Sequence, residues 1–241
     1  MTVTYMHFKL SEQFASSVLE GSAQAFPIML GCVPIGIAYG VLAQQAGLAL
    51  LSTLGFSLFV FAGASQFMAV SMMQSGLEPG AIIGATFIVN FRHVLMSASI
   101  APRLKSWKIW QRVLFGGMLT DETFILHSLN FGRGATDIVS AVALNSAVYI
   151  TWAAAGMAGY NLGAMITNPE VWGLDFALPA MFVGLLLSAC KNKAGAAAAV
   201  AGGIISVGLH LLAVENWAAF FGALGGATAG IVFYLKEGAD S

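Results

Sequence analysis

The chain alternates between long apolar runs and short polar links. A run of about 20 apolar residues matches the hydrocarbon thickness of a bilayer. Eight runs follow one another, at 18–42, 48–75, 79–100, 112–129, 137–160, 171–190, 194–214 and 217–235. A polar lead-in, 1–17, precedes them and a short polar tail, 236–241, follows. The pattern predicts an all-α integral membrane protein with one transmembrane domain over 18–235 and about seven or eight transmembrane segments.

Two of these runs carry prolines in their interior. The first holds Pro27 and Pro34 among several glycines, and the sixth holds Pro179. An interior proline removes a backbone hydrogen bond and clashes with the preceding helical turn. We therefore expect broken or re-entrant helices at 18–42 and 171–190. Membrane proteins tolerate such backbone where it is buried in protein or lines a cavity.

The composition agrees with lipid as the main solvent. Hydrophobic residues make up 58% of the chain and charged residues only 9%, against about 25% charged in soluble proteins. A net charge of −1 and scattered basic residues provide no patch for nucleic acid. Membrane lipid is thus an expected partner and nucleic acid is not.

The basic residues give conflicting evidence on topology. The link after the third run holds the densest cluster, Arg103, Lys105, Lys108 and Arg112, and the link after the sixth holds Lys191. Both links should be cytoplasmic, yet they lie on opposite sides if every run crosses the membrane. Either a proline-bearing run such as the sixth does not cross fully, or too few charges follow it to set the orientation.

Three polar residues interrupt the third run in "NFRH", namely Asn90, Arg92 and His93. A charge at the bilayer centre costs about 2.5–3.5 kcal/mol on insertion scales, so such residues are functional candidates. Asn90 and His93 are three residues apart and share a helix face. Arg92 either pairs with a carboxylate as a structural counter-charge or reaches the interface with its long stem.

An acidic pair, Asp121 and Glu122, lies in the fourth run. Adjacent helical residues point about 100° apart, so one carboxylate can pair with Arg92 or His93 while the other faces a cavity. A carboxyl group removed from water binds a proton more readily, and histidine changes charge near neutral pH. His93, Asp121 and Glu122 are therefore candidates for proton coupling. The alternative is a static ion pair that joins helices.

A break in the first run would expose the N-terminus of a half-helix, which suits a carboxylate ligand. Secondary transporters use discontinuous helices in this way. The predicted substrate-binding residues are Gly31, Pro34, Gly36, Gln66, Asn90 and Asp121.

Motifs for catalysis are missing from the sequence. It contains no G-x-x-x-x-G-K-[ST] phosphate loop and no H-E-x-x-H metal pair, and "GASQF" departs from the G-x-S-x-G elbow. We therefore expect neither enzyme activity nor a cofactor or metal.

Five motifs in order resemble those of the AzlC family, the large subunits of bacterial AzlCD- and YgaZH-type branched-chain amino-acid exporters. They are "FPIMLGCVPIGIAYG", "FAGASQF", "NFRH", "TDETF" and "LDFALPAMF", and the resemblance covers roughly residues 18–235. It implies a multi-pass protein of the cytoplasmic (inner) membrane that exports valine, leucine or isoleucine, and in some members methionine. It also implies a small hydrophobic partner subunit of the AzlD or YgaH type.

The residues by themselves allow other functions. A passive facilitator or pore for another small neutral solute needs the same polar groups but no proton coupling. An accessory membrane subunit would need none of them, because glycine and alanine alone permit close helix packing.

Overall fold

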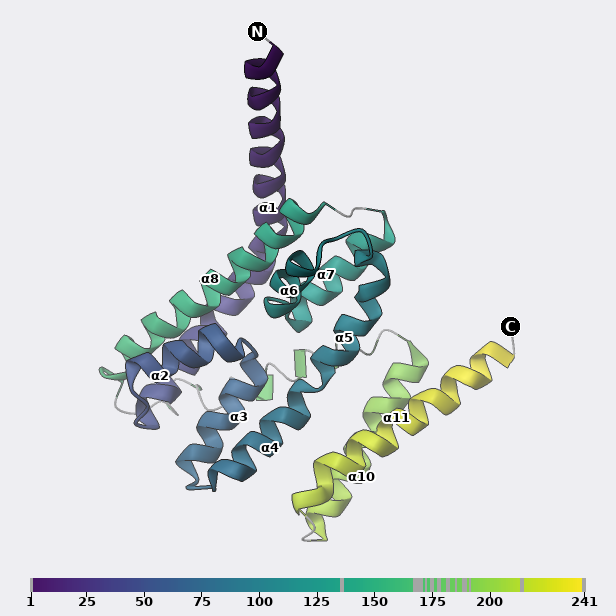
Figure 1. The fold of residues 1–241 in the computed structure, drawn as a ribbon. Helices are drawn as coiled ribbons and strands as arrows, with labels where there is room; N and C mark the ends of the chain where they lie inside the picture. Colours follow the sequence, from purple (N-terminus) through teal and green to yellow (C-terminus); the bar gives the residue numbers. More distant parts are fainter. Residues whose placement is uncertain are drawn as a thin grey trace. The chain divides into compact units, whose positions relative to one another are not determined.

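The structure is a computed structural model, and it describes most of the chain (Figure 1). The described residues are 2–134, 137–166, 192–212 and 215–239, with isolated positions 171, 173, 176, 179–180, 183–184, 186–187 and 190 between them. In these ranges the regular elements are all helices, which confirms the predicted all-α class for the described residues. The chain divides into two compact units, Met1–Leu178 and Pro179–Ser241.

The first helix, α1 (Thr2–Gln45), is a single element of 44 residues with Pro27 and Pro34 inside it. The predicted break at 18–42 is therefore wrong, and the polar lead-in belongs to the same helix as the first apolar run. A proline removes one hydrogen bond, and neighbouring helices in a membrane protein can compensate for that loss. Here the compensating neighbour is α8 (Ile138–Gly163), which packs along α1 (Figure 1).

Glycines bring α1 and α8 into close contact. A Cβ atom added at Gly40 would overlap the backbone of α8 at Gly156, and one added at Gly159 would overlap the backbone of α1 at Ile37. Gly36 faces Ala155 in the same seam. Small residues at such positions let two helices approach closely inside a membrane. This seam holds α1 along α8 past both prolines.

The second apolar run is interrupted although it contains no proline. It forms α2 (Leu50–Gly55), the π-helical η1 (Phe56–Val60) and α3 (Gly63–Gln74). Between them Phe61 has φ 42°, in the left-handed region that costs a non-glycine residue about 1–2 kcal/mol. Its buried ring packs edge-on against Tyr149 at 4.6 Å, and the Tyr149 hydroxyl donates to the Leu58 carbonyl at 2.7 Å.

The third and fourth runs and the link between them form five short helices. They are α4 (Pro79–Asn90), α5 (Arg92–Ile100), η2 (Ala101–Leu104), α6 (Ile109–Gly117) and α7 (Asp121–Gly132). Phe91 separates α4 from α5, and residues 118–120 separate α6 from α7. The second separation ends in a capping box, in which Thr120 and Thr123 exchange side-chain-to-backbone hydrogen bonds.

Two clusters of buried side chains form the core of this first unit. One joins α1, α3 and α8 through Tyr39, Phe67 and Trp152. The other joins the α5–α6 link to α7 through Trp107, Phe115 and Phe131. Most large apolar side chains outside these clusters are exposed, which is the surface expected of helices that face lipid.

The second unit is described as a pair of helices, α10 (Lys193–Leu211) and α11 (Glu215–Ala239), packed against each other. Gly202 of α10 lies against Gly222 and Gly226 of α11, so close that added Cβ atoms would meet backbone. The sixth apolar run, 171–190, lies largely outside the described residues, and so does the re-entrant element predicted there.

Four of the described helices are long and apolar enough to cross a membrane. They cover Glu12–Gln45, Pro79–Leu104, Ile138–Gly163 and Lys193–Leu211. The second and fourth runs are missing from this group because each is divided into shorter pieces. The number of seven or eight segments is therefore not confirmed.

Candidate functional site

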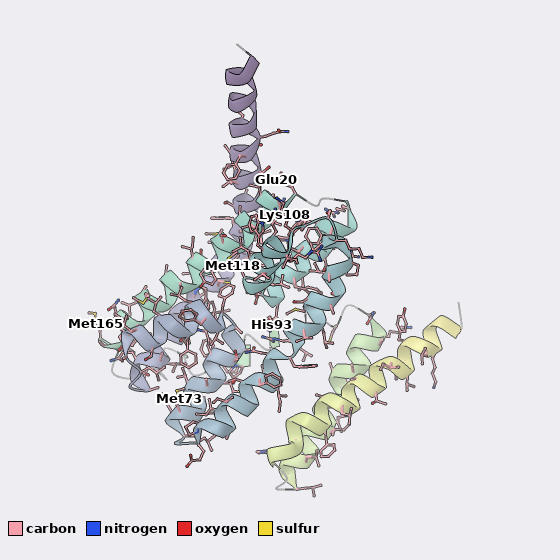
Figure 2. The ribbon with its side chains drawn as sticks, viewed as in Figure 1. Glu20, Met73, His93, Lys108, Met118 and Met165 are labelled. Carbon is pink, nitrogen blue, oxygen red and sulfur yellow. The ribbon has the colours of Figure 1, made fainter. Side chains whose placement is uncertain are left out.

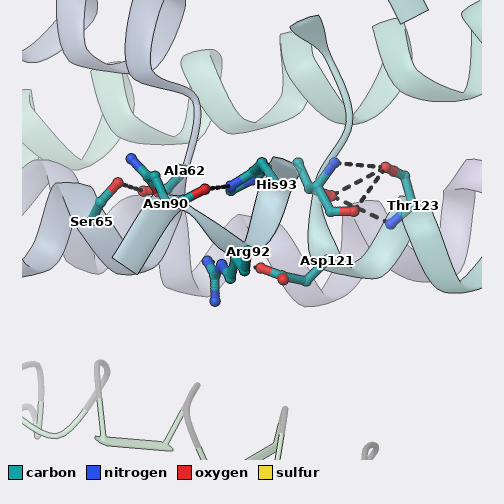
Figure 3. Close-up of polar contacts among 8 residues, drawn as sticks. Ala62, Ser65, Asn90, Arg92, His93, Asp121 and Thr123 are labelled. Carbon is teal, nitrogen blue, oxygen red and sulfur yellow. Dashed lines mark hydrogen bonds and ion pairs between the residues drawn. The ribbon is translucent and has the colours of Figure 1, made fainter. Parts of the chain in front are cut away.

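The polar residues of the third and fourth runs meet in space at the two helix separations. An Nη atom of Arg92, the first residue of α5, lies 2.9 Å from a carboxylate oxygen of Asp121, the first residue of α7 (Figure 3). In the view of Figure 2, His93 lies between Met73 and Lys108.

The local backbone favours the charge of Asp121. The first N–H groups of a helix and its dipole attract a carboxylate at this position, and the Arg92 guanidinium adds a second positive group. The two side chains are 27% and 21% exposed. Ion pairs in contact with water contribute about 0–1 kcal/mol, so this pair is a modest stabiliser whose charges remain accessible.

Two buried polar atoms beside the ion pair lack a hydrogen-bond partner among the described residues. They are the Asn90 side-chain oxygen Oδ1 and the Arg92 Nε atom. One is an acceptor and the other a donor. Leaving such an atom unsatisfied costs about 1–3 kcal/mol. Such a site is suited to a ligand that supplies a hydrogen-bond donor for the Asn90 oxygen and an acceptor for the Arg92 N–H.

His93 is held by the helix separation itself. Its Nδ1 atom lies 3.1 Å from the Asn90 backbone carbonyl. A carbonyl can only accept, so Nδ1 carries the proton and donates. In the neutral ring Nε2 is then the acceptor, which is the atom through which His93 can take up a proton.

Glu122 follows Asp121 on α7, so its side chain leaves the helix about 100° around from that of Asp121. It is half-buried and forms no ion pair with any described residue. Its charge lies near enough to Cys32 of α1 to act on that side chain electrostatically. Of the two carboxylates, Glu122 is therefore the one without a cationic partner in the described part of the chain.

Gln66 is fully buried on α3, but its side chain has protein partners. It donates to the Ser57 hydroxyl at 3.3 Å and accepts from the Trp152 indole at 3.0 Å. This amide joins η1, α3 and α8. To contact a substrate, as predicted, Gln66 would have to give up its hydrogen bond to Ser57 or to Trp152.

Gly31, Pro34 and Gly36, which were predicted to lie at a break in α1, do not lie at a helix end. Gly31 is exposed and has open space where a side chain would be, whereas Gly36 packs against α8. Pro34 lies within the continuous helix. No half-helix begins between Gly31 and Gly36, so α1 offers no helix end there, and the substrate contact of Gly31, Pro34 and Gly36 stays a prediction. Half-helices begin instead at Gly63 and Asp121.

The structure adds polar residues that the sequence analysis did not single out. A cavity of about 180 Å³ lies between α1, α7 and α8, lined in part by Glu20, Gln24 and Asn130. Asn130 donates to Gln24 at 2.7 Å and Gln24 to Glu20 at 3.1 Å. Glu20 and Gln24 are four residues apart at the start of the first apolar run. This spacing places them on one face of a helix and could have identified them in the sequence.

His127, which lines this cavity, belongs to a buried network that ties α6, α7 and α8 together. Asn145 donates from Nδ2 to the Phe115 carbonyl at 3.1 Å, which orients its oxygen toward His127 at 2.7 Å. His127 Nε2 must therefore be the donor in that contact. The network holds the C-terminal turn of α6 beside α7.

A metal site is not indicated. Among the described residues, no group of three or more histidine, cysteine, aspartate or glutamate side chains is placed to hold an ion.

An all-helical architecture, an apolar outer surface and a charged cluster at interrupted helices define a multi-pass membrane protein. The sequence model of the AzlC protein matches residues 27–166, more than half of the chain. The protein therefore belongs to the AzlC family, which confirms the resemblance found in its motifs.

Named relatives agree with this membership. An uncharacterized membrane protein of Archaeoglobus fulgidus is 31% identical over 86% of this chain and 91% of its own length. The inner membrane protein YgaZ of Escherichia coli is 27% identical over 83% of this chain and 85% of its own. The branched-chain amino acid transport protein AzlC of Bacillus subtilis is 22% identical over 75% and 71%. No solved structure is significantly similar to this chain.

Proposed function

We propose that this protein exports branched-chain amino acids across the bacterial cytoplasmic membrane, as the large subunit of a two-component secondary transporter coupled to protons. Valine, leucine and isoleucine are the proposed substrates, with methionine as a further candidate. The proposal starts from membership of the AzlC family and from the B. subtilis relative, whose name describes branched-chain amino acid transport. The proposed partner is a small hydrophobic subunit of the AzlD or YgaH type.

The observation that carries the substrate class is the pair of unmatched atoms at the charged cluster. The unsatisfied Arg92 Nε can donate to a carboxylate, and the unsatisfied Asn90 Oδ1 can accept from an ammonium group. A zwitterionic amino acid carries both groups. Arg92 thus takes over the carboxylate contact that the sequence assigned to a break in α1.

The acidic pair supports a means of coupling. Asp121 is held by Arg92, so Glu122 is the carboxylate with a free charge for the substrate ammonium. A proton on Glu122 removes that charge and weakens the ammonium contact. Proton and amino acid then compete for one site, which is the requirement for exchanging an inward proton for an outward amino acid. His93, with Nε2 free to accept, is the proposed carrier of the proton to this site.

A second function is a passive facilitator or pore for another small neutral solute. The exposed fractions of Arg92 and Asp121 are compatible with a wet pathway that needs no coupling.

Efflux of preloaded radiolabelled leucine from cells without their own exporters tests the proposal. The cells express this chain alone or with the small-subunit gene, each with and without an uncoupler. Efflux that needs the partner and collapses with the proton gradient supports the two-component exporter. Efflux that is indifferent to the uncoupler identifies a facilitator, and no leucine efflux from protein located in the membrane rejects the substrate.

A further inference from the structure

The link between α5 and α6 concentrates positive charge at one place on the first unit. It carries Arg103, Lys105 and Lys108, and Arg112 follows on α6. The chain from 79 to 120 contains no aspartate or glutamate. No described residue forms an ion pair with these four side chains. The link is therefore a cationic surface without an acidic partner in the described part of the chain.

Internal hydrogen bonds give this link a defined conformation. The Arg112 guanidinium donates to the carbonyls of Lys105 and Trp107, at 2.6 and 2.9 Å. Trp107 is buried and packs edge-on against Phe115 and Phe131, with ring centroids 5.4 and 6.0 Å apart. Two fixed points, a guanidinium clamp and an aromatic anchor, thus hold the backbone that presents Lys105 and Lys108.

The lysines differ from the arginines in what they contact. Arg103 donates to the Ser99 carbonyl at 3.4 Å. Like Arg112, it therefore uses its side chain to bind backbone nearby in the chain. Lys105 and Lys108 are exposed. A lysine ammonium is a compact point charge with three donors, and these two are available to an anion at the surface.

An apolar face begins directly after Lys108. Ile109, Trp110 and Val113 of α6 are 79%, 59% and 68% exposed. Helix α6 has nine residues, about 14 Å, which is too short to cross a bilayer. Exposed apolar side chains next to lysines, with an exposed indole at the boundary, match the position of headgroups above acyl chains.

We propose that Lys105 and Lys108 bind the phosphate of an anionic phospholipid, while Ile109, Trp110 and Val113 contact its acyl chains. The link connects α5 to α6, and α7 follows α6. Helix α5 begins with Arg92 and α7 begins with Asp121. A lipid bound here fastens the link to the membrane surface and steadies both helices that supply the ion pair. This inference does not depend on which solute the protein carries.

Trp110 provides the reporter for a test on the purified full chain in lipid vesicles. Quenching of its fluorescence by brominated phosphatidylglycerol is compared with quenching by brominated phosphatidylcholine, and the Trp110→Phe variant identifies the signal of Trp110. The wild type should prefer the anionic lipid, and the preference should weaken when salt is raised from 50 to 500 mM, because screening shortens the reach of the charges.

The double variant Lys105→Gln/Lys108→Gln should lose this preference. Each lysine near an anionic surface contributes about 1 kcal/mol, or about fivefold in affinity, so the preference should fall by roughly 25-fold. Lys105→Arg/Lys108→Arg, which keeps both positive charges at the same positions, is the control and should retain the preference. Equal quenching by both lipids in the wild type, a preference insensitive to salt, or a preference retained by Lys105→Gln/Lys108→Gln would each overturn the proposal.

Discussion

The Arg92 guanidinium lies 2.9 Å from the Asp121 carboxylate and joins the first turn of α5 to the first turn of α7. Both residues begin a helix directly after a separation in the chain. The pair therefore links two places where the backbone is interrupted within apolar runs. Beside it lie the unmatched atoms of Asn90 and Arg92. This place in the first unit therefore combines two helix separations, an ion pair and two polar atoms without a hydrogen-bond partner among the described residues.

Asp121→Asn should lower leucine efflux while the protein remains in the membrane. The change removes the anionic partner that positions the Arg92 guanidinium, while the free energy of folding changes by only about 0–1 kcal/mol, the contribution of a partly exposed ion pair. Asp137→Asn is the matched control, because Asp137 caps α8 and asparagine caps a helix equally well. Efflux is measured with both variants at equal membrane levels. Wild-type efflux from Asp121→Asn would reject a role for the ion pair in transport.

Glu122→Gln should abolish the response of export to a proton gradient. The amide can hydrogen-bond to an ammonium group but cannot bind and release a proton, so competition between proton and substrate disappears. Leucine efflux from proteoliposomes is measured as a function of the pH difference across the membrane. The wild type should depend on this difference, and the variant should be slow and indifferent to it. A variant that follows the wild-type curve would place the coupling elsewhere.

Gly40→Ala and Gly31→Ala should have opposite effects on stability. A methyl group at Gly40 collides with α8 backbone, whereas one at Gly31 meets open space. Overpacking costs about 1–3 kcal/mol, and alanine is favoured over glycine within a helix by up to about 1 kcal/mol. Thermal unfolding of the detergent-purified full chain should show a lower midpoint for Gly40→Ala only. A large loss from Gly31→Ala would indicate a special backbone at that position after all.

Phe61→Gly should be more stable than Phe61→Ala, which is the reverse of the usual order of these two residues in a helix. Both small residues lose the ring packing on Tyr149, at about 3–5 kcal/mol. Phe61→Gly also removes the cost of the left-handed conformation, about 1–2 kcal/mol, whereas Phe61→Ala keeps it. The glycine variant should therefore unfold at the higher temperature. If alanine is the more stable, Phe61 is not held in this conformation.

Asn145→Ala should destabilise the protein far more than Asn161→Ala on the same helix. Asn145 is fully buried and bonds to both Phe115 and His127. Its loss leaves the His127 ring N–H unsatisfied, at about 1–3 kcal/mol, whereas the Phe115 carbonyl keeps its bond from the Met118 N–H. Asn161 is exposed and bonds only within its own helix, so its loss should cost less than about 0.5 kcal/mol. Comparable unfolding midpoints for the two variants would show that the buried network contributes little.

The interrupted helices show how far local signals extend. Prolines predicted a break in α1, yet the glycine seam with α8 keeps that helix continuous. Two of the real separations, one within "FAGASQF" and one directly before Asp121, contain no proline. The threonines that form the capping box at Thr120 and Thr123 were a readable signal for the second. The first depends on contacts with Tyr149 from a helix far along the chain, which no local pattern contains.

The candidate site was partly readable for a similar reason. Charges in apolar surroundings identify Arg92, His93, Asp121 and Glu122 as a group, because their cost at depth demands compensation. The sequence allowed either carboxylate to pair with Arg92 or His93. Only the positions of α5 and α7 decide that Asp121 pairs with Arg92 and that Glu122 has no cationic partner among the described residues.

The sequence by itself determined that this protein is built from helices that face lipid. A chain with 58% hydrophobic and 9% charged residues must satisfy its backbone internally where it meets lipid, and helices achieve this with local hydrogen bonds alone. The tertiary structure decided where helices break, which charges pair and which polar atoms stay unmatched. These outcomes depend on contacts between residues distant in the chain, such as Gly40 with Gly156 or Arg92 with Asp121, and such contacts exist only once the helices have packed.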